Sequence, residues 1–332
     1  MQVGVATNTA DSRVELRISE SVSQSLQCPV CCAGLRRGID RLVCVSRICG
    51  VTFPVVDGIP VLLNESASIF RFDEVVANRR ASTGDGGRGV KGALRGLLPS
   101  ISRNIGAEEN YARFTSLLLA LSDSPRVLVV GGGALGKGMQ HLVDNGSVEL
   151  VETDVSFGTR TSLICDAHDI PFGDETFDGV IVQAVLEHVV DPYRCVEEIH
   201  RVLKNQGLVY SETPFMQQVH MGRFDFTRFT HLGHRRLFRK FEEIESGAVC
   251  GPGMALAWAY QYFLLSFAAS GLLRALLMAF ARITSFPLKY FDDYLINKRG
   301  TFDSASGYYF VGRKGSEILP DRELIRMYRG AL

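Results

Sequence analysis

The chain has 332 residues, of which 46% are apolar and 22% charged, and its formal net charge is zero. This length allows one large domain with one or two small modules. Because there is no surplus of basic residues, the composition disfavours a nucleic-acid substrate. Residues 1–20 lack the apolar core of a secretory signal, so the eight cysteines indicate metal ligation and free thiols in a reducing compartment. We therefore expect a cytoplasmic protein.

The sequence predicts four parts along the chain. Residues 1–25 are expected to form a disordered tail and residues 26–64 a small cysteine-rich module. Residues 65–122 form a linker, clearest as a flexible stretch at 79–92, followed by helices that cover the site of the large domain. Residues 123–332 form that α/β domain, which carries a helical insertion at 252–300.

Four short apolar runs predict buried parallel strands that alternate with helices. They are Arg126–Val130, Val148–Asp154, Phe177–Gln183 and Gly207–Pro214. The first runs into a glycine-rich turn, where side chains at Gly131, Gly133 and Gly136 would block a ligand lying against the backbone. At the end of the second run, the Asp154 carboxylate can accept hydrogen bonds from a ribose diol. Since ligands bind outside the carboxyl ends of parallel strands, this pattern predicts a site for an adenosine-containing cofactor.

Two classes of cofactor share this arrangement, nicotinamide dinucleotides and S-adenosylmethionine, and the motifs after Asp154 separate them. These motifs are Asp166–Phe172 (Asp-Ala-His-Asp-Ile-Pro-Phe), Val185–Val189 (Val-Leu-Glu-His-Val) and Arg201–Gly207 (Arg-Val-Leu-Lys-Asn-Gln-Gly). On these motifs, residues 124–215 resemble the class I S-adenosylmethionine-dependent methyltransferases. The resemblance implies a Rossmann-like α/β fold with a mostly parallel seven-stranded sheet. Asp166, at another strand end, is positioned to accept from the adenine amino group.

One position departs from the pattern of that family. The family usually has an acidic residue two positions before the first glycine of the loop, and here that residue is Val129. The nearest acids that could compensate are Glu152 and Asp154. A weaker alternative is an NAD-dependent oxidoreductase, in which Tyr294 and Lys298 would transfer a proton to a carbonyl.

The cysteine-rich module predicts a structural zinc site. Cys28 and Cys31 have the spacing of a zinc knuckle, and Cys44 and Cys49 form a second, more widely spaced pair. Four thiolates at about 2.3 Å would close a tetrahedral site with no open position. Cys32 either replaces Cys31 or remains a free thiol.

A hairpin turning at Asp57–Gly58 is expected directly after these cysteines. With its segment Phe53–Pro60, the module resembles zinc ribbons related to the small methyltransferase-activating subunits. The alternative is a ribbon that has lost its metal and is held by the apolar hairpin; a module this small buries little surface without a metal.

The loop after the fourth strand is the predicted substrate site, because loops at the carboxyl ends of strands carry the chemistry of such sheets. His220 and Asp225 are candidates to orient or deprotonate a nucleophile, and Arg228 to bind an anionic group. His188 is a rival base, with a local structural role as its alternative. The acceptor is expected to be a small or lipid-linked molecule that carries a hydroxyl or an amine.

A segment without charged residues, 246–273, is long enough to span a bilayer. A single crossing would separate the last predicted strand, 306–314, from the sheet that it must join. Three interpretations remain for residues 252–284: a buried helical hairpin over the site, a homodimer surface, or contact with the inner face of a membrane. The main functional hypothesis is a methyltransferase, and the alternative from another class is a non-catalytic protein of the same fold that binds a partner through the ribbon.

Overall fold

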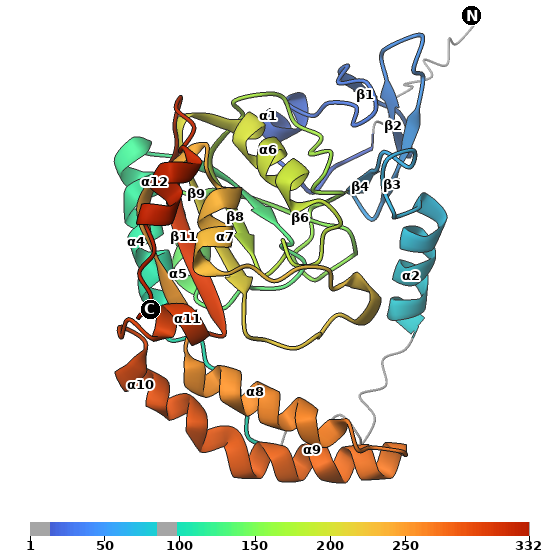
Figure 1. Ribbon diagram of the computed structural model, residues 1–332. Helices are drawn as coiled ribbons and strands as arrows, with labels where there is room; N and C mark the ends of the chain where they lie inside the picture. Colours follow the sequence, from blue (N-terminus) through green and yellow to red (C-terminus); the bar gives the residue numbers. More distant parts are fainter. Residues whose placement is uncertain (1–13, 85–97, 332) are drawn as a thin grey trace, which may run out of the picture.

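The computed structural model describes residues 14–84 and 98–331 (Figure 1). Over residues 80–84, which end a helix, only the backbone is described. Residues 85–92 of the predicted flexible stretch therefore lie outside the described residues, as do residues 1–13 of the predicted tail. The tail prediction is wrong for residues 20–24, because they form helix α1 (Glu20–Gln24). Ser19 caps this helix by accepting from the Val22 N–H, and Val22 is buried.

The large domain is built on a mostly parallel sheet whose seven strands have the order β7-β6-β5-β8-β9-β11-β10. Its strands are β5 (Arg126–Val130), β6 (Glu149–Asp154), β7 (Leu163–Cys165), β8 (Phe177–Gln183), β9 (Leu203–Pro214), β10 (Phe241–Cys250) and β11 (Gly307–Lys314). The strands from β7 to β9 are parallel, whereas β11 lies antiparallel between β9 and β10. The predicted fold class is confirmed.

Both faces of this sheet are covered, which explains why its strands read as continuous apolar runs. On β5, Val127 and Val129 pack with helix α4 (Ala107–Leu121), whereas Leu128 and Val130 belong to the cluster that contains helix α6 (Pro192–Val202). The remaining helices of this domain are α5 (Gln140–Val143), α7 (His231–Leu237) and α12 (Asp321–Arg326). Helix α4, which lies within the stretch 65–122 where helices were predicted, therefore packs into the core.

The cysteine-rich module adds four strands to the edge of the large sheet. They are β1 (Leu35–Arg37), β2 (Arg41–Cys44), β3 (Thr52–Val56) and β4 (Ile59–Leu62), and consecutive strands are antiparallel. The predicted hairpin turn is present at Asp57 and Gly58, which both have positive φ, 52° and 77°. Strand β4 then pairs in parallel with β7, Val61 opposite Ile164, so the module continues the sheet of the large domain.

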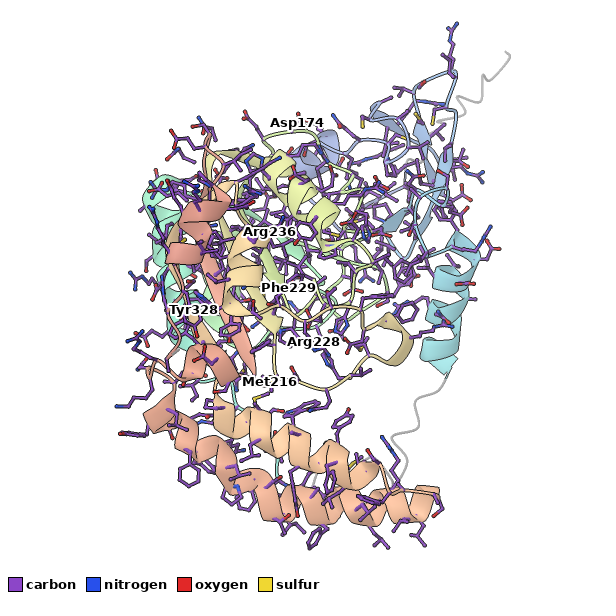
Figure 2. All side chains as sticks on the ribbon, in the orientation of Figure 1. Asp174, Met216, Arg228, Phe229, Arg236 and Tyr328 are labelled. Carbon is purple, nitrogen blue, oxygen red and sulfur yellow. The ribbon has the colours of Figure 1, made fainter. Side chains whose placement is uncertain are left out.

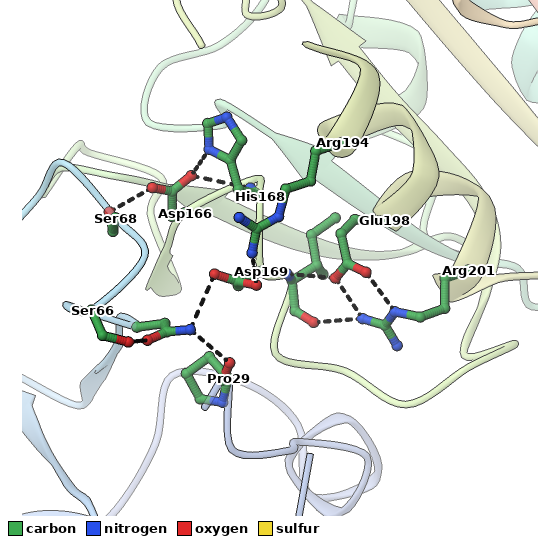
Figure 3. Close-up of polar contacts among 11 residues, drawn as sticks. Pro29, Ser66, Ser68, Asp166, His168, Asp169, Arg194, Glu198 and Arg201 are labelled. Carbon is green, nitrogen blue, oxygen red and sulfur yellow. Dashed lines mark hydrogen bonds and ion pairs between the residues drawn. The ribbon is translucent and has the colours of Figure 1, made fainter. Parts of the chain in front are cut away.

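Polar contacts fasten the module to the loop after β7 (Figure 3). The Asn64 amide donates to the Pro29 carbonyl and to the Asp169 carboxylate, each at 3.4 Å, and Arg194 from α6 donates to Asp169 at 2.5 Å. Ser68 donates to Asp166 at 2.5 Å. The segment that connects the module to helix α2 (Phe72–Gly84) is thereby held against the large domain.

A helical hairpin projects from the sheet domain (Figure 1). It consists of α8 (Pro252–Leu265) and α9 (Gly271–Ser285), followed by η2 (Phe286–Phe291), α10 (Asp292–Leu295) and α11 (Thr301–Ser304). The buried carboxylate of Asp292 accepts from the N–H groups of Gly253 and Met254 and so caps α8.

The interpretation of this insertion as a buried hairpin is wrong for α9. Only Ala281 and Ser285 of that helix are buried, whereas Leu272, Leu276 and Phe280 are more than half exposed. Among the described residues, the helical run Gly271–Leu295 is long and apolar enough to cross a membrane by length and composition, with a mean hydropathy of 1.3.

Candidate functional site

The glycine-rich turn after β5 is packed so closely that three of its positions have no room for a side chain. Gly131 has φ +75°, and a Cβ there would lie 2.3 Å from Val185 Cγ2. A Cβ at Gly133 would lie 2.8 Å from the Asp154 carboxylate, and one at Gly136 would lie 2.2 Å from Gln183 Oε1. The predicted glycines are thus required by the neighbouring strand ends as well as by any ligand above them.

The first cavity of the site has a volume of about 410 Å³ and opens at the ends of β5, β6 and β7. The carboxylates of Asp154 and Asp166 line it together with an apolar wall that includes Val155, Ala167 and Ile170. A mostly apolar cavity lined by two acids suits a nucleoside, whose base stacks on aliphatic groups and whose hydroxyl and amino groups need acceptors.

The two acids of the first cavity already have protein partners. Asp154 accepts from the Gly133 N–H at 3.1 Å and, through its other oxygen, from Ser156. Asp166 accepts from Ser68 and from both the backbone and the ring of His168. Burial opposes ionisation of Asp166, but these hydrogen bonds reverse that effect and lower its pKa. Both carboxylates are thereby held at the wall of the cavity.

The second cavity, of about 380 Å³, lies on the other side of the glycine turn and is polar. Its carboxylates among the described residues are Glu187 and Glu212. Glu212 is buried; it accepts from Asn104 and Gln183, each at 2.9 Å, and also from Tyr210. Burial raises the pKa of Glu212. These polar residues were not among the predicted site residues, although Gln183 ends a predicted strand and Glu187 lies inside a quoted motif.

The compensation predicted for the missing acid at Val129 does not come from Glu152. Val129 is buried and lies opposite Glu152 in the β5–β6 register. The Glu152 carboxylate pairs with Arg160 at 2.5 Å and lines neither cavity. Asp154 does hold the glycine turn, because it accepts from Gly133.

The two cavities meet at Gly131, Ala184 and His220, which line both of them. Ala184 has φ +53°, an unfavourable value for a residue with a Cβ, and its N–H donates to the Glu212 carbonyl. Backbone strain of this kind is concentrated at functional sites. The following turn presents Glu187 and His188 to the same junction.

A cluster of Glu187, His188 and His220 stands at this junction. The Glu187 carboxylate is 1% exposed, and neither of its oxygens accepts a hydrogen bond from any residue that the structure describes. Nε2 of His188 lies 3.6 Å and Nε2 of His220 lies 3.9 Å from Glu187 Oε1. Burial raises the pKa of Glu187 to about 8 and lowers that of His188. The structure thus brings the two predicted histidines together around an acid that was not predicted.

Asp225 and Arg228 hold the loop that carries His220. Burial alone would raise the pKa of Asp225, but hydrogen bonds from Arg228 and from the His220 N–H hold it well below its usual range. Arg228 donates to both oxygens of Asp225 and to the carbonyls of Gln217, Gln218 and Thr227. These bonds occupy the guanidinium and hold the loop, while Arg228 also lines a cavity beside it; that Arg228 binds an anionic group of the substrate stays a prediction.

A third cavity, of about 650 Å³, lies between this loop and helix α8. Figure 2 shows Met216 and Arg228 in the region between the sheet and the hairpin. The wall of the cavity is largely apolar and includes Phe215, Met216, Val219, Ala255 and Leu256. Tyr262 of α8 donates to the Val219 carbonyl at 2.7 Å, so the hairpin forms one side of this cavity.

Comparison with known proteins identifies the large domain. Residues 128–211 match the family described as "Methyltransferase domain". The domain that contains these residues is of the class I S-adenosylmethionine-dependent methyltransferase type. The chain is 26% identical over 124 residues to the ubiquinone/menaquinone biosynthesis C-methyltransferase UbiE of Citrifermentans bemidjiense. The match covers 32% of this chain and 52% of that protein. The demethylmenaquinone methyltransferase of Clavibacter sepedonicus is similar, so the chain spans about half the length of these curated relatives.

A solved structure of an S-adenosylmethionine-dependent methyltransferase from Archaeoglobus fulgidus is also similar, with a TM-score of 0.38 and 14% identity over 63% of this chain and 94% of that chain. A separate match of 49 residues is 41% identical to a UPF0434 protein of Pseudomonas savastanoi pv. phaseolicola and covers 15% of this chain and 80% of that protein. That segment belongs to the UPF0434 family, whose name states no function.

The four predicted metal ligands of the methyltransferase's cysteine-rich module converge. Cys28 Sγ lies 3.8 Å from Cys49 Sγ, and Cys31 Sγ lies 3.5 Å from Cys44 Sγ; all four sulfurs lie within 4.8 Å of one another. A tetrahedral zinc with bonds of about 2.3 Å separates its sulfur ligands by about 3.8 Å, so the donor set fits this ion. Cys32 is exposed and outside the group.

The residues of the oxidoreductase alternative lie outside this site. Tyr294 is 72% exposed on α10, with the Lys298 ammonium 4.4 Å from the centre of its ring, and neither residue lines any of the three cavities. In a dinucleotide-binding site the pyrophosphate meets the N-terminus of the helix after the glycine turn. Here that helix, α5, has four residues and begins only at Gln140.

Proposed function

We propose that this methyltransferase transfers a methyl group to a hydroxyl or an amine of an acceptor with an apolar body. The observation that carries the proposal is that two cavities of unlike character meet at the glycine turn. One has an apolar wall edged by Asp154 and Asp166, and the other is lined by buried polar groups. This arrangement matches the two ends of S-adenosylmethionine, a nucleoside and a charged amino acid.

The cofactor would be held by residues that the structure already fixes in place. Asp154 would accept from the ribose hydroxyls and Asp166 from the adenine. Glu212 and Gln183 would face the charged amino-acid end. S-adenosylmethionine, when bound, supplies an electrophilic methyl group. The protein's own part is to bind both molecules in line and to exclude water from the junction beside Ala184.

The acceptor would lie in the third cavity, because this cavity is apolar and adjoins the second one, with which it shares Gln217. The exposed face of the α8–α9 hairpin supports an acceptor that is itself amphiphilic or lipid-linked. This face would rest on a membrane surface or form a homodimer, and Phe280 and Leu276 would lie within it.

His188 and His220 are the groups that would handle the acceptor proton, because their Nε2 atoms face the junction. Asp225, which we predicted as catalytic, is proposed as a positioning residue, since it is ionised and held by Arg228. A second candidate acceptor is an aromatic ring carbon. The similarity to the two curated quinone methyltransferases favours it.

The cysteine-rich module is proposed to hold a structural zinc ion that keeps β4 on the edge of the sheet. Through Ser68 and Asn64, this module would then fix the loop that carries Asp166. The zinc has no catalytic part in this proposal, because four thiolates close its coordination shell.

The test is an assay of the full-length chain with S-adenosylmethionine and a panel of acceptors with alkyl chains and phenolic, alcoholic or amine groups. Mass spectrometry would measure S-adenosylhomocysteine and locate the methyl group. Turnover on an oxygen or nitrogen supports the proposal, and methylation of a ring carbon supports the second candidate. Binding of the cofactor without turnover on any acceptor would favour a non-catalytic, partner-binding protein.

A further inference from the structure

In the cluster of Glu187, His188 and His220, three groups with free electron pairs face one another, whereas a single proton-transfer step requires only one base. Nδ1 of His188 lies 2.7 Å from the Phe224 carbonyl, which can only accept, so this nitrogen carries the ring hydrogen. Nδ1 of His220 faces the Gln218 carbonyl at 3.3 Å and the Asp225 carboxylate at 3.4 Å, which are also acceptors. In both rings, Nε2 is therefore the atom with the free electron pair.

These two Nε2 atoms point at the same carboxylate. They lie 3.6 Å and 3.9 Å from Glu187 Oε1, and the three potential ligand atoms lie within 4.8 Å of one another. No described residue donates a hydrogen bond to the carboxylate, which is 1% exposed. A proton on Glu187 can be donated to one of the two Nε2 atoms, but the lone pair of the other Nε2 then still faces the carboxyl group without a donor.

The nearest cation of the protein does not resolve this arrangement, because the guanidinium of Arg228 is occupied by Asp225 and three carbonyl groups. A metal ion would resolve it. Two ligands at about 2.1 Å from one ion and in tetrahedral relation lie about 3.4 Å apart. The two nitrogen–oxygen separations, 3.6 Å and 3.9 Å, are close to this value, and the two Nε2 atoms lie within 4.8 Å of each other. The outer hydrogen bonds to Phe224 and Asp225 are those that orient histidines which ligate metals.

We propose that Glu187, His188 and His220 bind one divalent metal ion. One carboxylate and two imidazoles suit Mn²⁺, Fe²⁺ or Zn²⁺ and leave coordination positions open. His220 lines both the first and the second cavity, so these positions open onto the space where the cofactor and acceptor sites meet. This centre is distinct from the closed site of the four cysteines.

The consequence for the acceptor rests on the proposed function. A bound cation lowers the pKa of a coordinated hydroxyl group, which makes its oxygen a better nucleophile near neutral pH. The class of acceptor is therefore an alcohol, phenol or vicinal diol that binds the ion through oxygen. His188 and His220 then act as ligands rather than as bases.

Titration of the full-length protein with Mn²⁺, after dialysis that removes loosely bound metal but retains the zinc of the cysteine site, tests the centre without any turnover; the electron paramagnetic resonance signal reports the free ion. Mn²⁺ prefers oxygen and nitrogen ligands and so avoids the thiolate site. We expect one Mn²⁺ per chain, and at least tenfold weaker binding in Glu187→Gln and His220→Gln. His200→Gln is the matched control, because it changes a partly buried histidine of α6 that lines none of the three cavities, and it should bind Mn²⁺ as the wild type does.

Absence of Mn²⁺ binding at millimolar concentration, or unchanged binding in Glu187→Gln, would overturn the proposal. The cluster would then be held by a proton shared between Glu187 and a histidine. Equal loss in His200→Gln would also overturn it, because the effect would not belong to these ligands. Circular dichroism verifies that each variant is folded. Of these variants, His220→Gln depends least on core packing, because His220 lies on a loop. Calorimetry with S-adenosylmethionine on the same samples separates failure of this centre from failure of the proposed methyltransferase.

Discussion

The glycine turn makes a quantitative prediction at Gly131. The substitution Gly131→Ala places a Cβ at φ +75° and 2.3 Å from Val185 Cγ2. The left-handed conformation costs a residue with a Cβ about 1–2 kcal/mol. Forcing an extra methyl group into packed surroundings costs about 1–3 kcal/mol more. We expect the free energy of unfolding to fall by about 2–5 kcal/mol, and S-adenosylmethionine to bind more weakly because Gly131 lines both cavities.

A double-mutant cycle in urea, followed by circular dichroism, separates the two costs. In Gly131→Ala/Val185→Ala the overlapping Cγ2 is gone and the nearest remaining atom of residue 185 is the Cβ at 3.6 Å. The steric cost of the added methyl group, about 1–3 kcal/mol, should therefore appear as a coupling energy between positions 131 and 185. The cost of the left-handed backbone conformation should remain in the double mutant. The matched control is Gly146→Ala, whose Cβ would meet nothing within 4 Å. A Gly131→Ala variant as stable as this control would refute the reasoning.

Three further predictions concern other parts of the molecule. Cys44→Ser should lose zinc, measured by mass spectrometry of the metal content, whereas Cys32→Ser should retain it. Phe280→Asp should reduce sedimentation with anionic phospholipid vesicles several-fold, whereas Ile318→Asp, at an equally exposed site outside the hairpin, should not; equal effects would contradict a membrane-facing hairpin. Burial lowers the pKa of His234 to about 3. Below about pH 6.5 the His234 imidazole binds a proton in the unfolded chain but not in the folded protein. The contribution of His234 to the free energy of unfolding is therefore fully present above that pH, and it falls by about 1.4 kcal/mol per pH unit on acidification towards pH 3. His234→Gln should show a correspondingly smaller slope in urea unfolding across pH 6.5–4.5; an unchanged slope would contradict it.

The strands and the glycine turn were predictable because their signals are local. Arg126–Val130 and Phe177–Gln183 coincide with β5 and β8, since a strand buried on both faces must be continuously apolar. Spacing predicted the four cysteines of the module but left Cys31 and Cys32 as alternatives, and the sulfurs that converge include Cys31. The pairing of β4 with β7 joins residues far apart in the sequence, and no local pattern indicates it.

The features that the sequence did not reveal depend on tertiary packing. Glu187 is buried without a donor only because the turn around it and the loop bearing His220 close over it, and a sequence does not distinguish such a carboxylate from an exposed one. The contacts of Arg228 were not predictable from the sequence, because its partners are mostly backbone carbonyls of its own loop, which any residue supplies. The exposure of α9 was not predictable either, since core and surface-docking helices share an apolar composition.

The most direct test of the account is a calorimetric titration of the full-length chain with S-adenosylmethionine, with NADH as the competing ligand. The account predicts micromolar binding of S-adenosylmethionine, lost in Asp154→Ala and retained in the exposed control Asp144→Ala, and no binding of NADH. Absence of S-adenosylmethionine binding, or equal binding in Asp154→Ala, would contradict the assignment of the two cavities to this cofactor.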